Sequence, residues 1–228
     1  MSSINTRTPW LRWVAAKAFS EMFGLGLTFG VGVLILSSLG NQHSVLVILI
    51  SFLVAVAIGT IEATLVGLAQ WWAMPPWFPM ITRGSWWLAT LIGAWVAYVM
   101  SYLPSTLMSL GEQTSQAQAP VAEPEQWIVL LLAAGLGVAG GAALSFAQWL
   151  TMRNKVQGAS IWIPANMLAW LVGMPLIFWG IDAAQKLGGM VWLILFMAGV
   201  LLLTGLVVSA IHGAFLVRLA KLQKSLAF

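Results

Sequence analysis

Six long apolar runs dominate this sequence and restrict what it can fold into. An α-helix rises about 1.5 Å per residue, so about 20 apolar residues are enough to cross a hydrocarbon core about 30 Å thick. The runs occupy roughly 18–39, 44–72, 85–104, 127–150, 160–181 and 190–217. The sequence therefore predicts an all-α bundle of six transmembrane helices, in a single integral membrane domain that covers residues 1–228.

The composition indicates that lipid is the solvent around these helices. Apolar residues make up 61% of the chain and charged residues 7%, whereas soluble domains average about 45–50% and about 25%. Because so few charged side chains cannot cover a water-exposed surface, most of the surface should face hydrocarbon. We therefore expect the lipid bilayer as the main partner, with other membrane proteins as further candidates.

The residue types that most catalytic and metal sites need are missing from the sequence or wrongly spaced. The chain has no cysteine, which excludes disulfides, thiolate nucleophiles and thiolate metal ligands. Its sequence also lacks phosphate-binding glycine loops, zinc-binding His–Glu spacings and nucleophile elbows. We expect a protein that is not an enzyme and has no metal site, and the sequence indicates no particular cofactor.

Basic residues gather on one side of the predicted membrane. Six spans place both termini on the same side as the connections 73–84 and 151–159. Nine of the ten Lys and Arg residues fall on this side: Arg7, Arg12, Lys17, Arg83, Arg153, Lys155, Arg218, Lys221 and Lys224. The positive-inside rule then predicts cytoplasmic termini. We expect the membrane itself to be the inner (plasma) membrane of a bacterium. Attraction to anionic lipid explains these charges, so we expect no nucleic-acid partner.

One long connection on the opposite side separates the chain into two halves. Residues 105–126 are rich in Gln, Ala, Pro and Glu and contain no aromatic residue. This composition is typical of a flexible surface loop. We therefore expect a flexible outer loop at 105–126.

Two predicted hairpins share a sequence pattern, in which GLAQWWAM aligns with SFAQWLTM. If the connection is three residues shorter in the second hairpin, three pairs match: Gln70 with Gln148, Trp87 with Trp162, and Trp95 with Trp170. Both hairpins start on the same side of the membrane, so this is a parallel repeat, with copies at about 44–104 and 127–181.

Small residues recur at every fourth position on the first helix of each hairpin. They are Ala55, Gly59, Ala63 and Gly67 in the first hairpin, and Ala133, Gly137, Gly141 and Ser145 in the second. A spacing of four residues places them on one face of the helix, where small side chains let another backbone approach closely. We expect a compact bundle packed through these faces.

The last span and the first are expected to form a third, eroded copy, at about 190–217 plus 10–39. The copy aligns Gly205, Ser209 and His212 of the last span with Gly141, Ser145 and Gln148, and Trp13 of the first span with Trp87. Three polar residues, Gln70, Gln148 and His212, would then lie at equivalent heights near the cytoplasmic helix ends.

The Gln-Trp pairs Gln70–Trp71 and Gln148–Trp149 carry a resemblance to known sequences. The chain resembles uncharacterised bacterial multi-pass membrane proteins in which such a pair, near a helix end, recurs before a Trp-bearing helix. The resemblance covers residues 55–181 and implies topology alone. The first hairpin departs from the pattern, because Pro75 and Pro76 stand where basic residues are expected.

Glu62 is the most informative single residue. It lies nine residues before Trp71, about 14 Å along the helix, which places it near the middle of the bilayer. A carboxylate at this depth is costly unless it is paired, so Glu62 should face the bundle interior. It is either a contact for an ion, proton or ligand, or a structural acid that is hydrogen-bonded to a neighbouring helix. Asn166 is a plausible partner.

Two other polar residues, Glu21 and His212, are candidates for function that also have a structural explanation. Glu21 follows Lys17 by one helical turn, and an interfacial ion pair explains both. His212 could be the single axial ligand of a haem or pigment, or a packing residue like the two glutamines. A haem bound by two histidines is not expected, because His43 lies on the opposite side of the membrane.

The aromatic belt at the membrane surface and packing between helices explain the fourteen tryptophans. Trp13, Trp86 and Trp162 are among those expected in the belt at the cytoplasmic edge. The alternative is a ligand cavity lined by tryptophan.

Three functions remain open. The first is a non-enzymatic accessory or packing subunit, which the small-residue faces favour. The second is a transporter or channel for an ion or small solute that uses Glu62. The third is a haem- or pigment-binding subunit that uses His212.

Overall fold

The computed structural model describes residues 7–39, 44–114 and 124–225. The described chain is helical apart from short turns. The helices are α1 (Arg7–Ser38), α2 (Val45–Ala73), α3 (Arg83–Thr114), α4 (Gln126–Met152), α5 (Trp162–Gln185) and α6 (Met190–Ser225), with a short 3-10 turn at Ala159–Ile161. The prediction of an all-α fold is confirmed.

All six helices are long and apolar enough to cross a membrane, which confirms the predicted number of spans. Their outward surface is apolar, unlike the surface of a soluble protein. Large apolar side chains point outward, with Leu34 and Met190 each 72% exposed. Charged and amide side chains such as Lys17, Glu21 and Gln148 are buried in the interior. This arrangement suits a protein that is surrounded by hydrocarbon.

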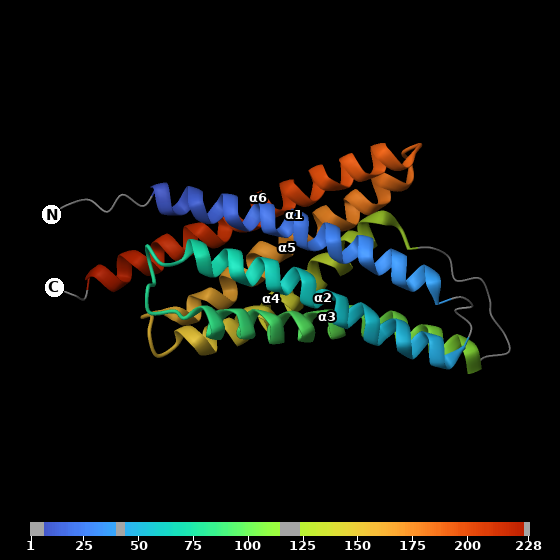
Figure 1. Cartoon of the computed structure of the whole chain (residues 1–228), viewed down its shortest axis with the longest axis horizontal. Helices are drawn as coiled ribbons and strands as arrows, with labels where there is room; N and C mark the ends of the chain where they lie inside the picture. Colours follow the sequence, from blue (N-terminus) through green and yellow to red (C-terminus); the bar gives the residue numbers. More distant parts are fainter. Residues whose placement is uncertain (1–6, 40–43, 115–123, 226–228) are drawn as a thin grey trace.

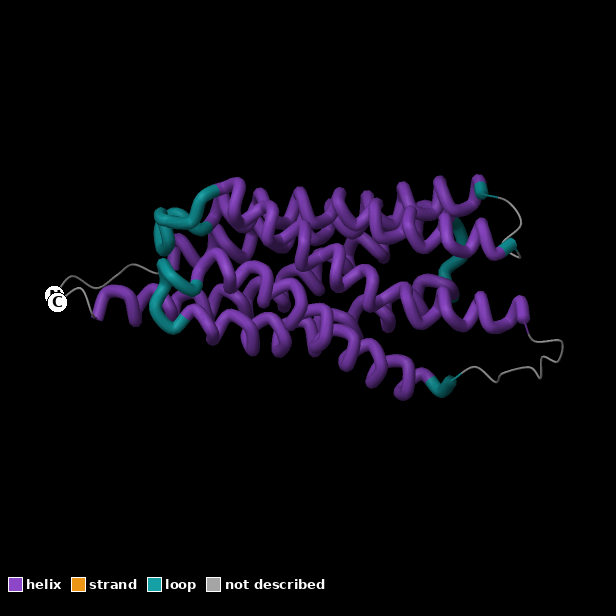
Figure 2. Tube along the Cα trace, turned by 90° about the horizontal axis from the view of Figure 1, so that it is seen from below, coloured by secondary structure: helices purple, strands orange, loops and turns teal. Residues whose placement is uncertain are grey.

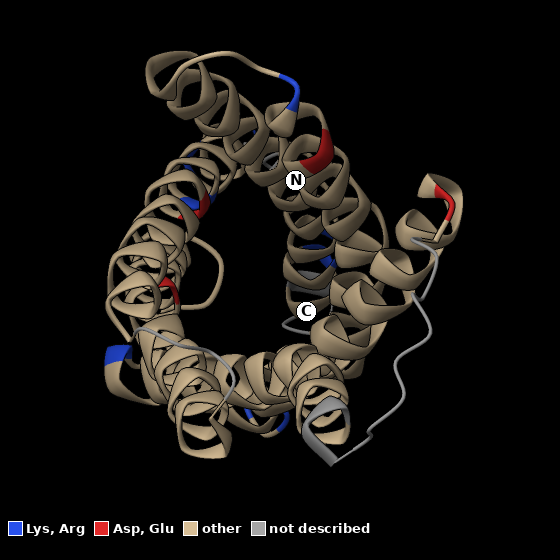
Figure 3. Cartoon of the chain, turned by 90° about the vertical axis from the view of Figure 1, so that its right-hand side faces the viewer, with Lys and Arg blue, Asp and Glu red and all other residues tan. Residues whose placement is uncertain are grey.

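The helices form a closed ring in chain order. Each helix packs against the next one in the sequence, and α6 returns to pack against α1. Viewed along the bundle, the six helices surround a common axis (Figure 3). The start of α1 and the end of α6 lie at the same end of the bundle, which we call the terminal end (Figure 1).

The two ends of the ring are packed differently. The helices diverge toward the end opposite the terminal end. There the α5–α6 hairpin bends away from α2 and α3 (Figures 1 and 2). At the terminal end, one apolar cluster draws residues from all six helices and both connections. Its centre is three tryptophans that are 0% exposed, Trp13, Trp86 and Trp162. We call this cluster the tryptophan plug.

The plug corrects the expectation that these three tryptophans belong to the aromatic belt. The ring centres of Trp13 and Trp86 each lie 6.1 Å from that of Trp162, within the range of favourable aromatic contacts. Trp72 does behave as a belt residue, because it is 54% exposed and the Arg12 guanidinium lies 3.8 Å from its ring centre. Hydropathy cannot separate these two roles, since both place tryptophan near a helix end.

Helix α3 continues into the expected outer loop. It extends to Thr114, although the sequence predicted a loop from residue 105. Pro104 lies within the helix, and the hydroxyls of Ser105 and Thr106 donate to the Tyr102 carbonyl at 3.0 and 2.8 Å. Residues that are typical of loops are thus accommodated in a helix that outlasts its apolar run. Residues 115–123 of the expected loop lie outside the described residues.

The small-residue faces are used inside the chain. A methyl group on Gly137 would lie 2.1 Å from the Trp170 carbonyl oxygen, and one on Gly141 would lie 2.8 Å from that of Asn166. One on Gly205 would lie 2.8 Å from the Cα atom of Ala18. Glycine at these positions is what lets α4 approach α5, and α6 approach α1.

Candidate functional site

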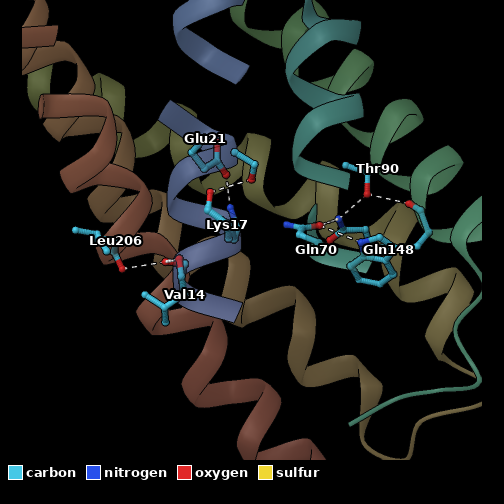
Figure 4. A network of polar contacts seen from close by, with 10 residues as sticks. Val14, Lys17, Glu21, Gln70, Thr90, Gln148 and Leu206 are labelled. Atoms are coloured by element: carbon cyan, nitrogen blue, oxygen red, sulfur yellow. Dashed lines mark hydrogen bonds and ion pairs between the residues drawn. The ribbon is translucent and has the colours of Figure 1, made fainter. Parts of the chain in front are cut away.

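Two buried glutamines tie four helices together beside the plug. Gln148 donates to the side-chain oxygen of Gln70 at 3.1 Å and to the hydroxyl of Thr90 at 2.9 Å. The indole of Trp86 donates to Gln70 at 3.0 Å, and that of Trp162 donates to Gln148 at 2.8 Å. Figure 4 shows the glutamines and Thr90 reaching toward one another from α2, α3 and α4. Because their partners are protein groups, we assign these glutamines to packing.

The two matching Trp–Gln contacts correct the register of the sequence repeat. Trp86 lies 16 residues after Gln70, and Trp162 lies 14 residues after Gln148. Trp86 is therefore the counterpart of Trp162, and the second connection is two residues shorter rather than three. In this register Trp170 aligns with Ala94 and not with Trp95. Trp87, which the sequence alignment chose, donates instead to the hydroxyl of Thr64 at 3.2 Å.

The expected third copy of the repeat, with His212 on α6 and Trp13 on α1, does not form the same contact. The imidazole of His212 is buried, and its ring centre lies 5.0 Å from that of Trp162. Neither nitrogen of His212 has a hydrogen-bond partner in the described part of the chain, and the same holds for the indole nitrogen of Trp13. His43, which the sequence argument compared with His212, lies outside the described residues.

Lys17 and Glu21 form an ion pair inside the bundle, not at its surface. They lie one turn apart on α1, and their side chains are 1% and 2% exposed. The Lys17 ammonium also lies 5.6 Å from the ring centre of Trp170 on α5. The pairing was expected, but its burial was not, since Lys17 was counted among the basic residues of the cytoplasmic surface. Figure 4 shows the pair on α1.

Glu62 lies on α2, opposite this ion pair. A methyl group on Gly24 of α1 would lie 3.1 Å from the Cα atom of Glu62, so the two helices are in close contact here. The carboxyl groups of Glu62 and Glu21 are near enough to interact, as are Glu62 and Lys17. The hydroxyl of Tyr98, from α3, donates to the Glu62 carboxylate. We call Lys17, Glu21, Glu62 and Tyr98 the charged cluster.

Asn166 is not part of this cluster. Its side-chain nitrogen donates to the Trp162 carbonyl at 2.8 Å, one turn earlier on α5. Its side-chain oxygen is buried and has no hydrogen-bond partner among the described residues. The structure thus pairs Glu62 with Tyr98 rather than with the predicted partner, Asn166.

The charged cluster lies beside an interior cavity of about 300 Å³. Glu62 and Tyr98 both line it, and its wall runs along α5 from Trp170 to Ile181, one turn before that helix ends. Five aromatic residues form part of the wall: Phe29, Tyr98, Tyr102, Trp170 and Phe178. The cavity thus occupies the diverging half of the ring, away from the tryptophan plug. His212 does not line it.

The sequence analysis did not single out Tyr98 and Tyr102, although the sequence contains a signal for them. They are the two tyrosines of the chain, and their spacing of four places them on one helix face. In the structure their rings stack, with centres 6.1 Å apart. A polar aromatic pair inside a predicted span marks a face that does not point into lipid.

The described residues contain no group of three or more His, Cys, Asp or Glu that could hold a metal ion. The charged cluster instead offers two carboxyl groups, one ammonium group and a phenol. Such a set binds protons or cations and can donate hydrogen bonds, but it lacks a nucleophile with an adjacent base.

Comparisons of the chain with family models, with curated proteins and with solved structures found no match. The functional argument therefore depends on the geometry of the site.

Proposed function

We propose that this protein transports a small solute across the membrane, through the interior of the six-helix ring, with Glu62 as the polar contact. The observation that carries the proposal is the position of the Glu62 carboxylate, half-buried at mid-span and facing a cavity. A carboxylate at the bilayer centre costs about 2.5–3.5 kcal/mol on insertion scales, and such residues mark ion and substrate paths. A structural acid has no need of a cavity.

The proposal includes an orientation. Basic residues of the described chain such as Arg7, Arg83, Arg153 and Arg218 belong to segments at the terminal end. By the positive-inside rule, this end faces the cytoplasm of a bacterium, across the inner membrane. The cavity then lies toward the non-cytoplasmic side, and the tryptophan plug closes the cytoplasmic side.

This arrangement corresponds to one state of an alternating-access cycle. A solute would enter the cavity from outside and reach Glu62, and the plug would have to rearrange for release into the cytoplasm. The cycle moves a solute without a chemical step, so no enzyme activity is proposed.

The accessory-subunit hypothesis has less support. The small-residue faces that suggested it, for example Gly137 and Gly141, are covered by α5 of the same chain. They are therefore not available to a partner subunit. The pigment hypothesis has less support too, because His212 lies beside the plug and does not line the cavity.

Ion and solute flux in proteoliposomes tests the proposal. We expect the purified protein to carry at least one probe from a panel of Na⁺, K⁺, methylammonium and tetraethylammonium. Glu62→Gln keeps the size of the side chain and removes its charge, so it should reduce this flux at least about tenfold. Asp182→Asn is the matched control, because Asp182 is an exposed acid paired with Lys186 outside the cavity. Flux that is unchanged by Glu62→Gln would contradict the proposal.

A further inference from the structure

The charges of the cluster do not balance if every group is ionised. Lys17 carries one positive charge, and Glu21 and Glu62 carry one negative charge each. Lys17 is paired with one oxygen of Glu21. The other oxygen, Oε2, is buried and has no hydrogen-bond partner in the described part of the chain. An uncompensated charge is costly in a bundle interior, so a further positive charge is needed here.

The groups that face the two acids do not supply this charge. From α1 comes Lys17, which is already paired, and from α3 come the phenols Tyr98 and Tyr102. His212, from α6, lies near enough to interact with Lys17. A positive charge on His212 would be repelled by the Lys17 ammonium group, so His212 does not supply the missing charge. The cavity walls contributed by α4 and α5 contain no ionisable residue. The missing charge must therefore be a proton or a cation that enters through the cavity.

The cavity wall indicates the chemical class of that cation. Hard cations such as Ca²⁺ take about 6–8 oxygen ligands, but the wall is mainly apolar and aromatic, with hydroxyls at Tyr98, Ser101 and Tyr102. Aromatic faces attract organic ammonium ions, which aromatic cages bind in other proteins. An ammonium ion with an apolar body would place its charge at Glu62 and its body against Phe29 and Phe178.

We propose that the cavity binds a lipophilic organic monocation at Glu62, and that each cation bound displaces one proton from the acid pair of Glu62 and Glu21. With the proton bound, the charges of Lys17, Glu21 and Glu62 sum to zero. With the cation bound and the proton released, they again sum to zero together with the cation. The exchange balances in charge and breaks no covalent bond other than the O–H bond of the acid. It deepens the proposed transport function by naming a substrate class and a coupled proton.

Binding of benzyltrimethylammonium to the detergent-solubilised full chain tests the exchange. This probe has a permanent charge and no ionisable proton, so any released proton comes from the protein. Titration calorimetry in two buffers of different ionisation enthalpy gives the number of protons released. We expect about one proton per cation, with an affinity that approaches a gain of about tenfold per pH unit where the pair is protonated.

Three variants separate the site from its surroundings. Glu62→Gln should abolish both binding and proton release, whereas Asp182→Asn should leave both unchanged. Ala97→Phe should abolish binding by filling the cavity without altering an acid, since Ala97 lines the wall. If Glu62→Gln does not fold, Ala97→Phe still tests whether the cation binds in the cavity. Folded wild-type protein that fails to bind the probe, or that binds it without proton release, would overturn the inference.

Failure of this inference can be distinguished from failure of the proposed transport function. Glu62-dependent flux of Na⁺ or K⁺, with no binding of benzyltrimethylammonium, would overturn this inference and support the proposed function. Binding with proton release, but no flux of any probe in proteoliposomes, would contradict transport and support the binding site.

Discussion

Ion pairs with the same helical spacing occur both on the surface and in the interior of this bundle. Glu62 and Asp182 are both acids, yet Asp182 makes an exposed ion pair with Lys186, which contributes little to stability. The Lys17–Glu21 pair has the same spacing of four but is fully buried. Removing one partner of such a pair leaves an unpaired charge in a medium of low dielectric constant.

Lys17→Met should therefore destabilise the protein strongly, by about 3–5 kcal/mol. The measurement is the melting temperature of the detergent-solubilised chain, followed by tryptophan fluorescence. The double variant Lys17→Met with Glu21→Gln removes both charges and should regain much of the loss. Lys186→Met is the matched control on the exposed pair and should shift the melting temperature little. An equal effect of Lys17→Met and Lys186→Met would show that the Lys17 pair is not buried.

Sequence patterns gave the pairing of Lys17 with Glu21 but not their place. Helical spacing brings the two side chains together wherever the helix lies. Whether they face lipid, water or another helix depends on α2 and α5, which pack against that turn of α1. The contact between Tyr98 and Glu62 was missed for the same reason, because it joins residues 36 positions apart.

At the scale of elements, the sequence predicted six spans correctly because hydropathy is a property of contiguous residues. It misjudged the end of α3, where Leu107 and Met108 continue the helix among polar neighbours. It also chose Trp87 over Trp86, because that register aligns Trp95 with Trp170 as well. The hydrogen bonds of the two indoles distinguish them, since Trp86 donates to Gln70 and Trp87 to Thr64. Contacts between helices, not patterns within one, settle that register.

The contact between α4 and α5 depends on glycine. Gly137→Ala would force a methyl group to within 2.1 Å of the Trp170 carbonyl oxygen, so the helices must separate. We expect a loss of about 1–3 kcal/mol, measured as a lower melting temperature. Gly135→Ala is the matched control on the same helix, because a methyl group there meets no atom within 4 Å. A larger loss for Gly135→Ala than for Gly137→Ala would contradict the packing described for α4 and α5.

At the scale of the whole molecule, the ring divides into two halves that are packed differently. The terminal half is filled by the tryptophan plug and tied by Gln70 and Gln148. The diverging half holds the cavity and Glu62. The closed sequence of helix contacts explains how both halves coexist, because a ring of six helices has an axis that side chains can either fill or leave open.

Accessibility of single cysteines tests this division most directly, and the natural chain has no cysteine to interfere. Ser101 lines the cavity and Ser145 is 0% exposed between helices, so Ser101→Cys and Ser145→Cys form a matched pair. A membrane-impermeant maleimide should label Ser101→Cys from the non-cytoplasmic side and should leave Ser145→Cys unlabelled from either side. Labelling of Ser101→Cys from the cytoplasmic side alone, or from neither side in folded protein, would contradict the account.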